Sequence, residues 1–185
     1  MNYQTLTEEE LLQHQQHFID FAKNDIEYFK FIPAKLRNQK EFILNFIKYF
    51  EEYEVDPINP AIYSKPYVAS YCKEMLATSL TLNNDREVVM KLAEKSISCL
   101  YHASDELKND KEIALVAIKG HIENRVDSSH FSHYSLNVFS NEIKEKIFTM
   151  NSYSEIVNWL ESELLYKELN EDLPSNNIEK KKVKI

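Results

Sequence analysis

Apolar residues recur every three to four positions along most of this chain, which is the spacing of helices that bury one face. Residues 38–53 show it clearly, since Phe42, Ile43, Phe46 and Ile47 fall on one side of a helix. A short turn or helix at 26–31 leads to Pro33. The pattern predicts helices over residues 7–24, 38–53, 67–79, 85–97, 99–106, 110–122, 142–150 and 152–169.

Three segments lose the helical period and set the expected domain organisation. Pro57, Pro60 and Pro66 mark residues 55–66 as an irregular insertion, because proline interrupts regular structure. Residues 127–140 are rich in serine and histidine, and residues 171–185 hold four lysines and little apolar character. We predict one helical domain over residues 1–170, interrupted at 55–66, and a flexible basic tail over 171–185.

One phrase occurs twice near the middle of the chain. Leu-Asn-Asn-Asp-Arg-Glu at 82–87 returns as Leu-Lys-Asn-Asp-Lys-Glu at 107–112, which is 25 residues later. A weaker copy, Leu-Arg-Asn-Gln-Lys-Glu, stands at 36–41. Sequence repeats of this length indicate stacked helical units, none of which can bury its apolar face alone.

Each phrase is typical of a helix start. We expect Asn84 and Asn109 to cap their helices, because a short side-chain oxygen accepts hydrogen bonds from the free amides of the first turn. Glu87 and Glu112, three residues on, are then placed to reach back as in a capping box. The aspartates between them fall in the first turn, where the helix dipole favours negative charge.

Composition supports a helical fold. The 185 residues include a single glycine, Gly120, whereas strands and phosphate-binding loops usually need several. Hydrophobic residues make up 43% of the chain, which is enough for a substantial core. We therefore predict an all-α protein, either stacked helical repeats or an irregular helical bundle of about seven to nine helices.

Net charge narrows the classes of partner. The formal charge is −8, and residues 1–170 carry 18 basic against 27 acidic residues. An acidic surface disfavours direct binding of nucleic acid and favours a partner protein with a basic surface. The first residues lack the pattern of a secretory signal, and no stretch reaches the roughly 18 apolar residues of a membrane span. We expect a cytoplasmic protein that does not insert into membranes.

The second phrase carries a resemblance to a known family. Residues 101–113 read Tyr-His-Ala-Ser-Asp-Glu-Leu-Lys-Asn-Asp-Lys-Glu-Ile, and this segment resembles an uncharacterised family, a domain of unknown function found as tandem helical repeats. The resemblance covers mainly residues 80–120 and is weaker over 28–47, where Gln39 replaces the aspartate. It implies a helical repeat fold, but it supplies no reaction, cofactor or catalytic residue.

Residues with reactive side chains form no complete site in the sequence. Cys72 and Cys99 fall on predicted helices without metal or redox spacing, which indicates buried free thiols. The histidine pairs at 14 and 17 and at 130 and 133 lack the further ligands that a metal site needs. The serine- and histidine-rich segment shows no third group or oxyanion hole for nucleophilic catalysis. We predict no metal, no cofactor and no catalytic residue.

Tyrosines around the proline-rich insertion are candidates for a protein interface, because tyrosine often anchors such contacts. The serine- and histidine-rich segment is a second candidate, since binding residues concentrate in loops. The candidate partner-binding residues are Tyr63, Tyr67, Tyr71, His130 and His133.

Three functions remain open from the sequence. The first is a non-enzymatic helical interaction module, in a specific form an inhibitor or immunity-type protein that neutralises a basic partner. The second is an adaptor or scaffold whose stacked helices hold a peptide. The third is an enzyme whose site the sequence does not reveal; a deep pocket with convergent polar groups would favour it.

Overall fold

The computed structural model describes residues 6–24, 26–52, 65–79, 81–123 and 133–171. Every regular element within these residues is a helix, which confirms the prediction of an all-α fold. The α-helices are α1 (Glu8–Gln13), α2 (Gln15–Asn24), α3 (Ala34–Arg37), α4 (Lys40–Glu52), α5 (Lys65–Thr78), α6 (Arg86–Lys95), α7 (Asp105–Lys108), α8 (Lys111–Glu123), α9 (Asn141–Ile147) and α10 (Tyr153–Glu171). The 3-10 helices are η2 (Ile26–Phe31), η3 (Leu82–Asn84), η4 (Ile97–His102) and η5 (His133–Val138).

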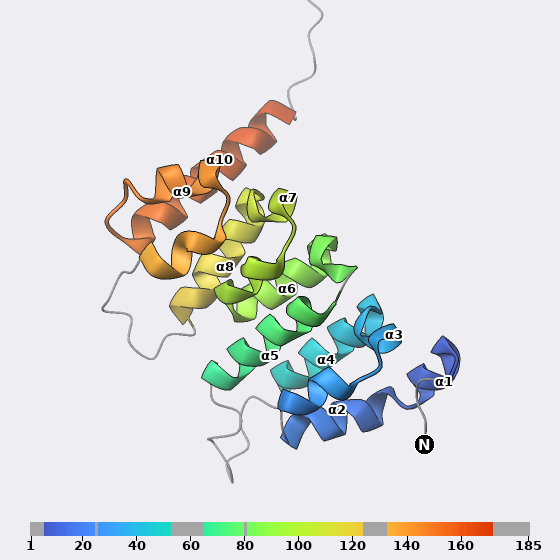
Figure 1. Ribbon diagram of the computed structural model, residues 1–185. Coiled ribbons are helices and arrows are strands. Elements are labelled where there is room, and N and C mark those ends of the chain that lie inside the picture. Colours follow the sequence, from blue (N-terminus) through green and yellow to red (C-terminus); the bar gives the residue numbers. More distant parts are fainter. Residues whose placement is uncertain (1–5, 25, 53–64, 80, 124–132, 172–185) are drawn as a thin grey trace, which may run out of the picture.

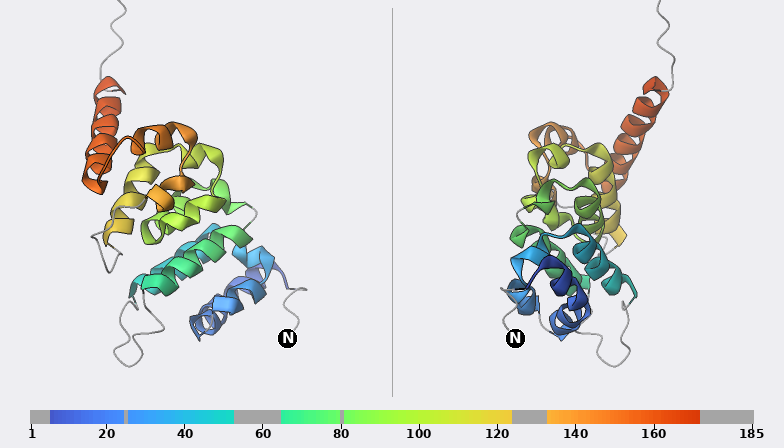
Figure 2. Two further views of the ribbon diagram at one scale, coloured as in Figure 1. Left: turned by 60° about the vertical axis from the view of Figure 1, so that its left-hand side comes forward. Right: turned by 90° about the vertical axis from the view of Figure 1, so that its right-hand side faces the viewer.

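The helices are stacked in chain order (Figures 1 and 2). α1 and α2 lie at one end, α4 and α5 follow, α6 and α8 form the middle, and α9 and α10 lie at the other end. α6 packs most extensively against α8, which also packs against α10. The second half of α10 extends beyond the stack in both views.

One continuous core runs through the stack. Many of its members occur in the predicted helices, whereas Leu136, Val138 and Phe139 come from the segment at 127–140 that was expected to be irregular. Each buried aliphatic or aromatic side chain contributes roughly 1.5–3 kcal/mol to folding. The apolar positions of the predicted helices that the structure buries include Phe42, Ile43, Phe46, Ile47, Val88, Val89, Leu92, Ala93, Ile113, Ala114, Ala117, Ile118, Ile156 and Leu160.

The contact between α6 and α8 depends on the single glycine. A Cβ atom added at Gly120 of α8 would lie 1.9 Å from the carbonyl oxygen of Glu94 in α6. The backbone of Gly120 has no positive φ, so the requirement for glycine arises from close approach and not from conformation. Gly120 therefore lets the two central helices cross backbone to backbone.

The first predicted helix is in fact two. The capping box at its start is present, because Thr7 Oγ1 accepts from the amide of Glu10 and Glu10 Oε2 accepts from the amide of Thr7. A turn at His14 then separates α1 from α2, so the helix predicted over 7–24 was wrong in its continuity. Gln15, the first residue of α2, has a buried Oε1 atom without a hydrogen-bond partner at this junction.

Two predicted irregular segments lie largely outside the described residues. Within the insertion predicted at 55–66, the structure describes only residues 65 and 66, and they belong to the first turn of α5. The tail predicted over 171–185 lies outside from residue 172 onward. The segment at 127–140 was expected to be irregular throughout, but His133–Val138 within it forms η5.

Candidate functional site

The repeated phrases do begin helices, but one residue later than predicted. Asp85 is the N-cap of α6, and its carboxylate accepts from the amide of Val88 at 3.1 Å. Asp110 plays the same part before α8, accepting from the amides of Glu112 and Ile113 at 2.9 and 3.1 Å. The prediction that the asparagines act as N-caps was therefore wrong.

A short helical turn before each phrase explains the shift. η3 ends at Asn84, and Asn109 is the C-cap of α7, so each asparagine closes one turn and leaves the cap of the next helix to aspartate. Glu87 and Glu112 consequently occupy the second helical position, not the third. Both bind cations of a neighbouring element instead of closing a capping box.

Ion pairs join each phrase to the next one along the stack. The basic residue of one phrase contacts the aspartate and glutamate of the next phrase, so α4 is joined to α6 and α6 to α8. The last basic residue, Lys111, reaches α10, where its Nζ also lies 5.9 Å from the centre of the Trp159 ring. The pairs are Lys40–Asp85 (3.0 Å), Lys40–Glu87 (2.8 Å), Arg86–Asp110 (2.9 Å), Arg86–Glu112 and Lys111–Glu163.

Asparagine and serine side chains make a second set of recurring contacts. Ser79 donates its hydroxyl hydrogen to Asn38 Oδ1 at 3.1 Å, and Ser104 donates to Asn84 Oδ1 at 2.7 Å. Ser140 donates in the same way to Asn109 Oδ1. Each phrase asparagine thus holds a serine that lies 20 to 41 residues further along the chain.

These contacts set the charge state of the capping aspartates. Burial raises the pKa of Asp110, but hydrogen bonds from Arg86 and from the amide of Ile113 outweigh that effect and leave the pKa below its usual 3.8. Burial likewise acts on Asp85, and the amide of Val88 and Lys40 bring its pKa below the same value. Both aspartates are therefore ionised at neutral pH.

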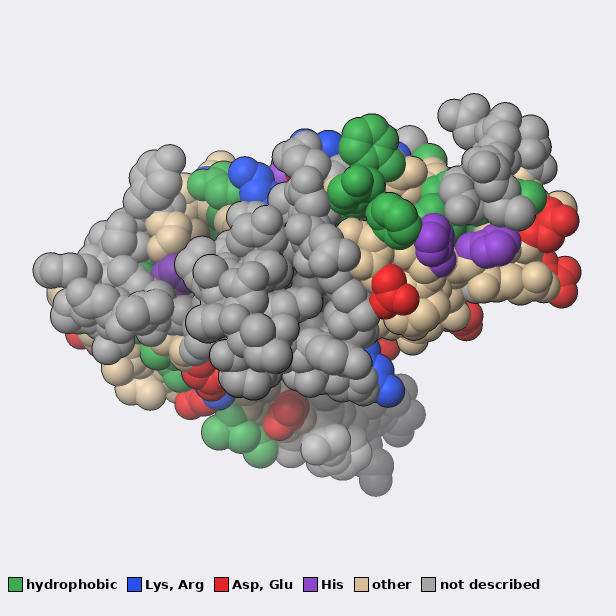
Figure 3. All heavy atoms as spheres, turned by 90° about the horizontal axis from the view of Figure 1, so that it is seen from below, with side chains coloured by type: hydrophobic (Ala, Val, Ile, Leu, Met, Phe, Trp, Pro, Cys, Tyr) green, Lys and Arg blue, Asp and Glu red, His purple; other side chains and the backbone are tan. Residues whose placement is uncertain are grey.

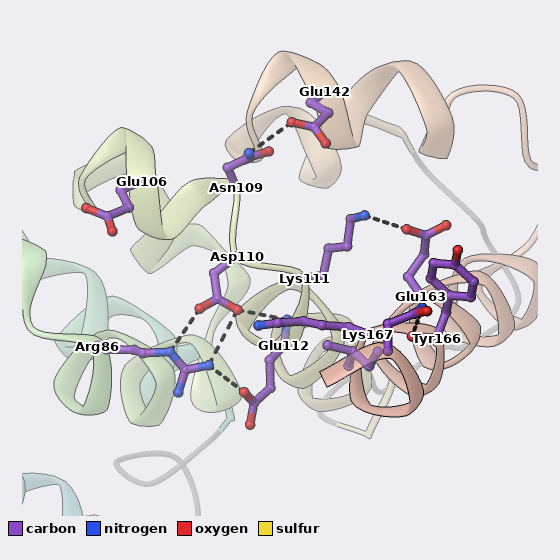
Figure 4. Close-up of a pocket in the computed structure, with 12 residues that line it drawn as sticks. Arg86, Glu106, Asn109, Asp110, Lys111, Glu112, Glu142, Glu163, Tyr166 and Lys167 are labelled. Carbon is purple, nitrogen blue, oxygen red and sulfur yellow. Dashed lines mark hydrogen bonds and ion pairs between the residues drawn. The ribbon is translucent and has the colours of Figure 1, made fainter. Parts of the chain in front are cut away.

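An open hollow of about 1000 Å³ lies over the ion pairs of Arg86 and Lys111, between α7, α8, α9 and α10. We call it the charged hollow. Figure 4 shows Arg86 between Asp110 and Glu112, with Lys111 pointing to Glu163 on the far wall. Its lining comprises Arg86, Glu106, Asn109, Asp110, Lys111, Glu112, Glu142, Glu163, Leu164, Tyr166, Lys167 and Asn170.

The charged hollow is acidic but largely neutralised. Five carboxylates and three cations line it, which is a formal excess of two negative charges. Arg86 and Lys111 already bind carboxylates of the lining, and Glu142 accepts from Asn109 Nδ2 at 3.0 Å. Most of its polar groups therefore serve the packing of the helices.

An apolar groove at the other end of the stack has a different character. We call it the aromatic groove, and its volume is about 340 Å³. Phe18 and Ile32 are buried and form its floor. Its remaining lining, exposed to solvent, consists of His17, Phe21, Tyr28 and Phe31.

Local helix geometry places these rings side by side. His17 and Phe21 are four residues apart on α2 and share one face. Tyr28 and Phe31 are three residues apart on η2, and a 3-10 helix eclipses such positions. Phe29, which lies between Tyr28 and Phe31 in the sequence, is fully buried. Its ring packs edge-to-face against Phe46 of α4, with the two ring centroids 5.4 Å apart, and this contact fixes η2 to α4.

The exposed rings form a continuous edge-to-face series. Their centroids are 4.7 Å apart for His17–Phe21, 5.4 Å for Phe21–Tyr28 and 6.1 Å for Tyr28–Phe31. Phe21, Tyr28 and Phe31 are 47%, 42% and 77% exposed. Figure 3 shows hydrophobic side chains gathered beside histidines on the face where this end of the stack is seen. Exposed apolar clusters of this kind commonly mark interaction sites.

The five predicted partner-binding residues cannot be compared with this groove. Tyr63 and His130 lie outside the described residues. Tyr67 and Tyr71 belong to α5, and His133 begins η5, but their side chains also lie outside the description. Their role at an interface stays a prediction.

Sequence reasoning missed the aromatic groove, although a signal for it was present. Tyr28, Phe29, Phe31 and Ile32 crowd four large apolar residues into five positions of a short element. A 3-10 turn buries only one side, so two of the four must face solvent. Here Phe29 and Ile32 are buried, and Tyr28 and Phe31 are exposed.

Other reactive side chains form no larger constellation in the described segments. Cys72 and Cys99 are buried free thiols, as predicted. The pKa of the Cys99 thiol is raised mainly by burial and, to a smaller extent, by the hydrogen bond with Cys72. His121 Nε2 lies 3.2 Å from the Tyr153 hydroxyl and 3.4 Å from the Ser135 hydroxyl. Among the described residues, no group of three or more histidines, cysteines and acids could hold a metal ion.

Within the described ranges, no helix combines the length and the apolar character needed to cross a lipid bilayer.

Comparison with known proteins gives a match to a family of unknown function. No curated protein and no solved structure matches the chain. Residues 85–144, which run from the cap of α6 into α9, match the family described as Domain of unknown function (DUF4116). The match agrees with the resemblance to an uncharacterised domain.

Proposed function

We propose that this chain is a non-enzymatic protein-interaction module, built of tandem helical units, that binds an apolar segment of a protein partner in the aromatic groove. The observation that carries the proposal is the series of exposed rings from Phe21 to Phe31. Large aromatic side chains with partial exposure are the residues that most often anchor protein interfaces.

The form of the groove favours a helix as the bound segment. Its floor is apolar, and its exposed walls come from two short elements, α2 and η2, which are joined at an angle. An amphipathic helix fills such a groove with side chains spaced three or four residues apart. Among the interpretations left open by the sequence, this arrangement favours the peptide-holding adaptor.

The ion pairs and hydrogen bonds that recur between successive phrases support the tandem organisation. The same basic-to-acidic and asparagine-to-serine contacts occur at equivalent positions of successive phrases. In such arrays the units provide a rigid support, and binding surfaces form along or at the ends of the stack.

A second candidate function is the inhibitor or immunity-type protein that binds a basic partner. The acidic lining of the charged hollow, with Tyr166 71% exposed at its edge, favours it. Because Arg86 and Lys111 already occupy several of its carboxylates, a partner must compete with internal pairs there. The aromatic groove needs no such rearrangement, and we place it first.

Selection from a library of displayed helical peptides tests the proposal. We expect the wild-type chain to enrich sequences with apolar residues spaced three or four apart, and a Phe21→Ser, Phe31→Ser variant to lose at least tenfold in affinity for them. Phe148→Ser is the matched control, because Phe148 is similarly exposed at 45% but lies at the end of α9. Equal binding by the groove variant, or no enriched sequence, would contradict the proposal.

A further inference from the structure

The far end of the stack carries an apolar helix face of the kind that fits the aromatic groove. Leu165 and Leu169 of α10 are 56% and 59% exposed, and Tyr166 stands beside them. Residues four apart lie on the same side of a helix, so the two leucines make one stripe. The part of α10 that bears them extends beyond the stack (Figures 1 and 2).

The stripe and the groove cannot meet within one molecule. α2 and η2 lie at one end of the stack and α10 lies at the other (Figures 1 and 2). Two molecules placed end to end would bring them together, because the stripe protrudes from one end and the groove is hollow at the other. Both halves of a complementary contact are thus present on this single chain.

The pairing of groove and stripe would repeat the way in which helical units pack within a stack. Each unit covers the apolar face that the previous unit leaves exposed, and separate molecules are normally maintained by polar outer faces on the terminal units. Here both ends expose apolar side chains, Phe31 at one and Leu169 at the other. We propose that the aromatic groove binds α10 of a second copy of this chain, head to tail, with Leu165 and Leu169 as the anchors. The inference rests on the proposed function, since it names the occupant of the same groove.

Charges at the two surfaces are compatible with this pairing. Lys30 is exposed between Tyr28 and Phe31, and Asp20 is exposed beside Phe21. On α10, Lys167 and Glu168 are exposed next to the stripe. Among the described residues, each surface thus carries at least one charge of either sign, and opposite charges at an interface rim favour one orientation more than they add affinity.

The size of the contact sets its strength. The patches are small, and interfaces that bury less than about 1,200 Å² in total are usually weak and transient. A head-to-tail contact also leaves one groove and one stripe unused at the ends of every open assembly, so further copies can add until a ring closes. We expect association that increases with concentration and does not stop at a dimer unless the ring closes.

Sedimentation velocity of the full chain, over a wide concentration range, tests the inference. We expect the weight-average mass of the wild type to rise above the monomer mass of 21.9 kDa as concentration increases. The groove variant Phe21→Ser, Phe31→Ser and the stripe variant Leu165→Ser, Leu169→Ser should each remain monomeric. Phe148→Ser should behave as the wild type. Thermal melting of each variant verifies that the fold is retained, as expected for substitutions of exposed residues.

Mixing the two variants is the decisive measurement. The groove variant keeps an intact stripe and the stripe variant keeps an intact groove, so an equimolar mixture should form a heterodimer and no larger species. A monomeric wild type, a stripe variant that still associates, or a mixture that stays monomeric would each overturn the inference. The display selection is independent of these results, so a groove that binds peptides but not α10 would leave the proposed function standing.

Discussion

Replacing Gly120 by alanine tests how the two central helices approach each other. The new Cβ atom would lie 1.9 Å from the carbonyl oxygen of Glu94, whereas ordinary contacts of this kind begin at 3.4 Å. The helices α6 and α8 must therefore separate by about 1.5 Å locally, because the obstructing atom belongs to the backbone and cannot rotate away.

Two opposing effects determine the change in stability. Alanine is favoured over glycine inside a helix by roughly 0.5–1 kcal/mol. Overpacking typically costs 1–3 kcal/mol, and a gap of even 0.5–1 Å removes roughly a quarter to a half of the dispersion energy of the atoms that it separates. The separation affects the neighbouring contacts of Leu92, Ala93 and Ala117, which are fully buried. We expect a net loss of about 2 kcal/mol in the free energy of unfolding, because an overpacking cost at the upper end of that range exceeds the gain from alanine.

Thermal and urea denaturation measure this loss. For a domain of this length, about 2 kcal/mol corresponds to a fall in Tm of roughly 4–8 °C. Lys119→Ala is the matched control, because Lys119 is the adjacent exposed residue of α8 and its pair with Glu161 is solvent-exposed. The control should change stability by no more than about 0.5 kcal/mol. A Gly120→Ala variant as stable as the wild type would refute the close crossing of α6 and α8.

Four further outcomes follow from the described contacts. Asp85→Ala should lower the free energy of unfolding by about 1 kcal/mol in urea titrations, as loss of an N-cap does; no change would return the cap to Asn84. Because the folded pKa of Asp110 lies below 3.8, the stability it contributes is present above that pH and is lost as the pH falls through the folded value. Asp110→Asn should therefore flatten the decline in stability measured below pH 4. Arg86→Met should lower the free energy of unfolding by less than about 1 kcal/mol, because Arg86 and its partners Asp110 and Glu112 are partly exposed. A loss that stays the same in high salt would contradict a screened ion pair. Phe31→Ser should shift Tm by little, because that ring is largely exposed, and a large fall would mean that it packs in the core.

Features that depend on neighbouring residues could be predicted from the sequence, whereas features that depend on residues far apart in the chain could not. The helices and their buried faces were predictable, because the apolar period at positions such as Phe42 and Ile113 is a local property. The cap was misplaced by one residue, because the choice between Asn109 and Asp110 depends on α7, a four-residue turn without a period of its own. The need for Gly120 was invisible, since the obstructing carbonyl belongs to a residue 26 positions away.

The candidate site was harder to predict than the fold. The aromatic groove combines residues of α2 with residues of η2, and only the angle between the two elements decides that Phe21 and Tyr28 meet. The ion pair between Lys40 and Asp85 joins residues 45 positions apart, so neither partner identifies the other in the sequence. Charge alone indicated an acidic molecule and gave no sign that its carboxylates bind its own cations.

The ion pairs that recur between successive phrases would survive the removal of one whole segment of the chain. The phrases at 82–87 and 107–112 each carry both the acids that receive the preceding cation and the cation that reaches the following acids, as Asp110, Lys111 and Glu112 do. Removal of residues 86–110 would place Lys111 directly after Asp85 and restore the same order of aspartate, cation and glutamate at the seam. Lys40 would still face an aspartate and a glutamate, and Lys111 would keep its own partner on α10. Loss of this segment would therefore leave neither Lys40 nor Lys111 without an acidic partner, so the charges at the seam set no barrier to a stack that is shorter by one segment.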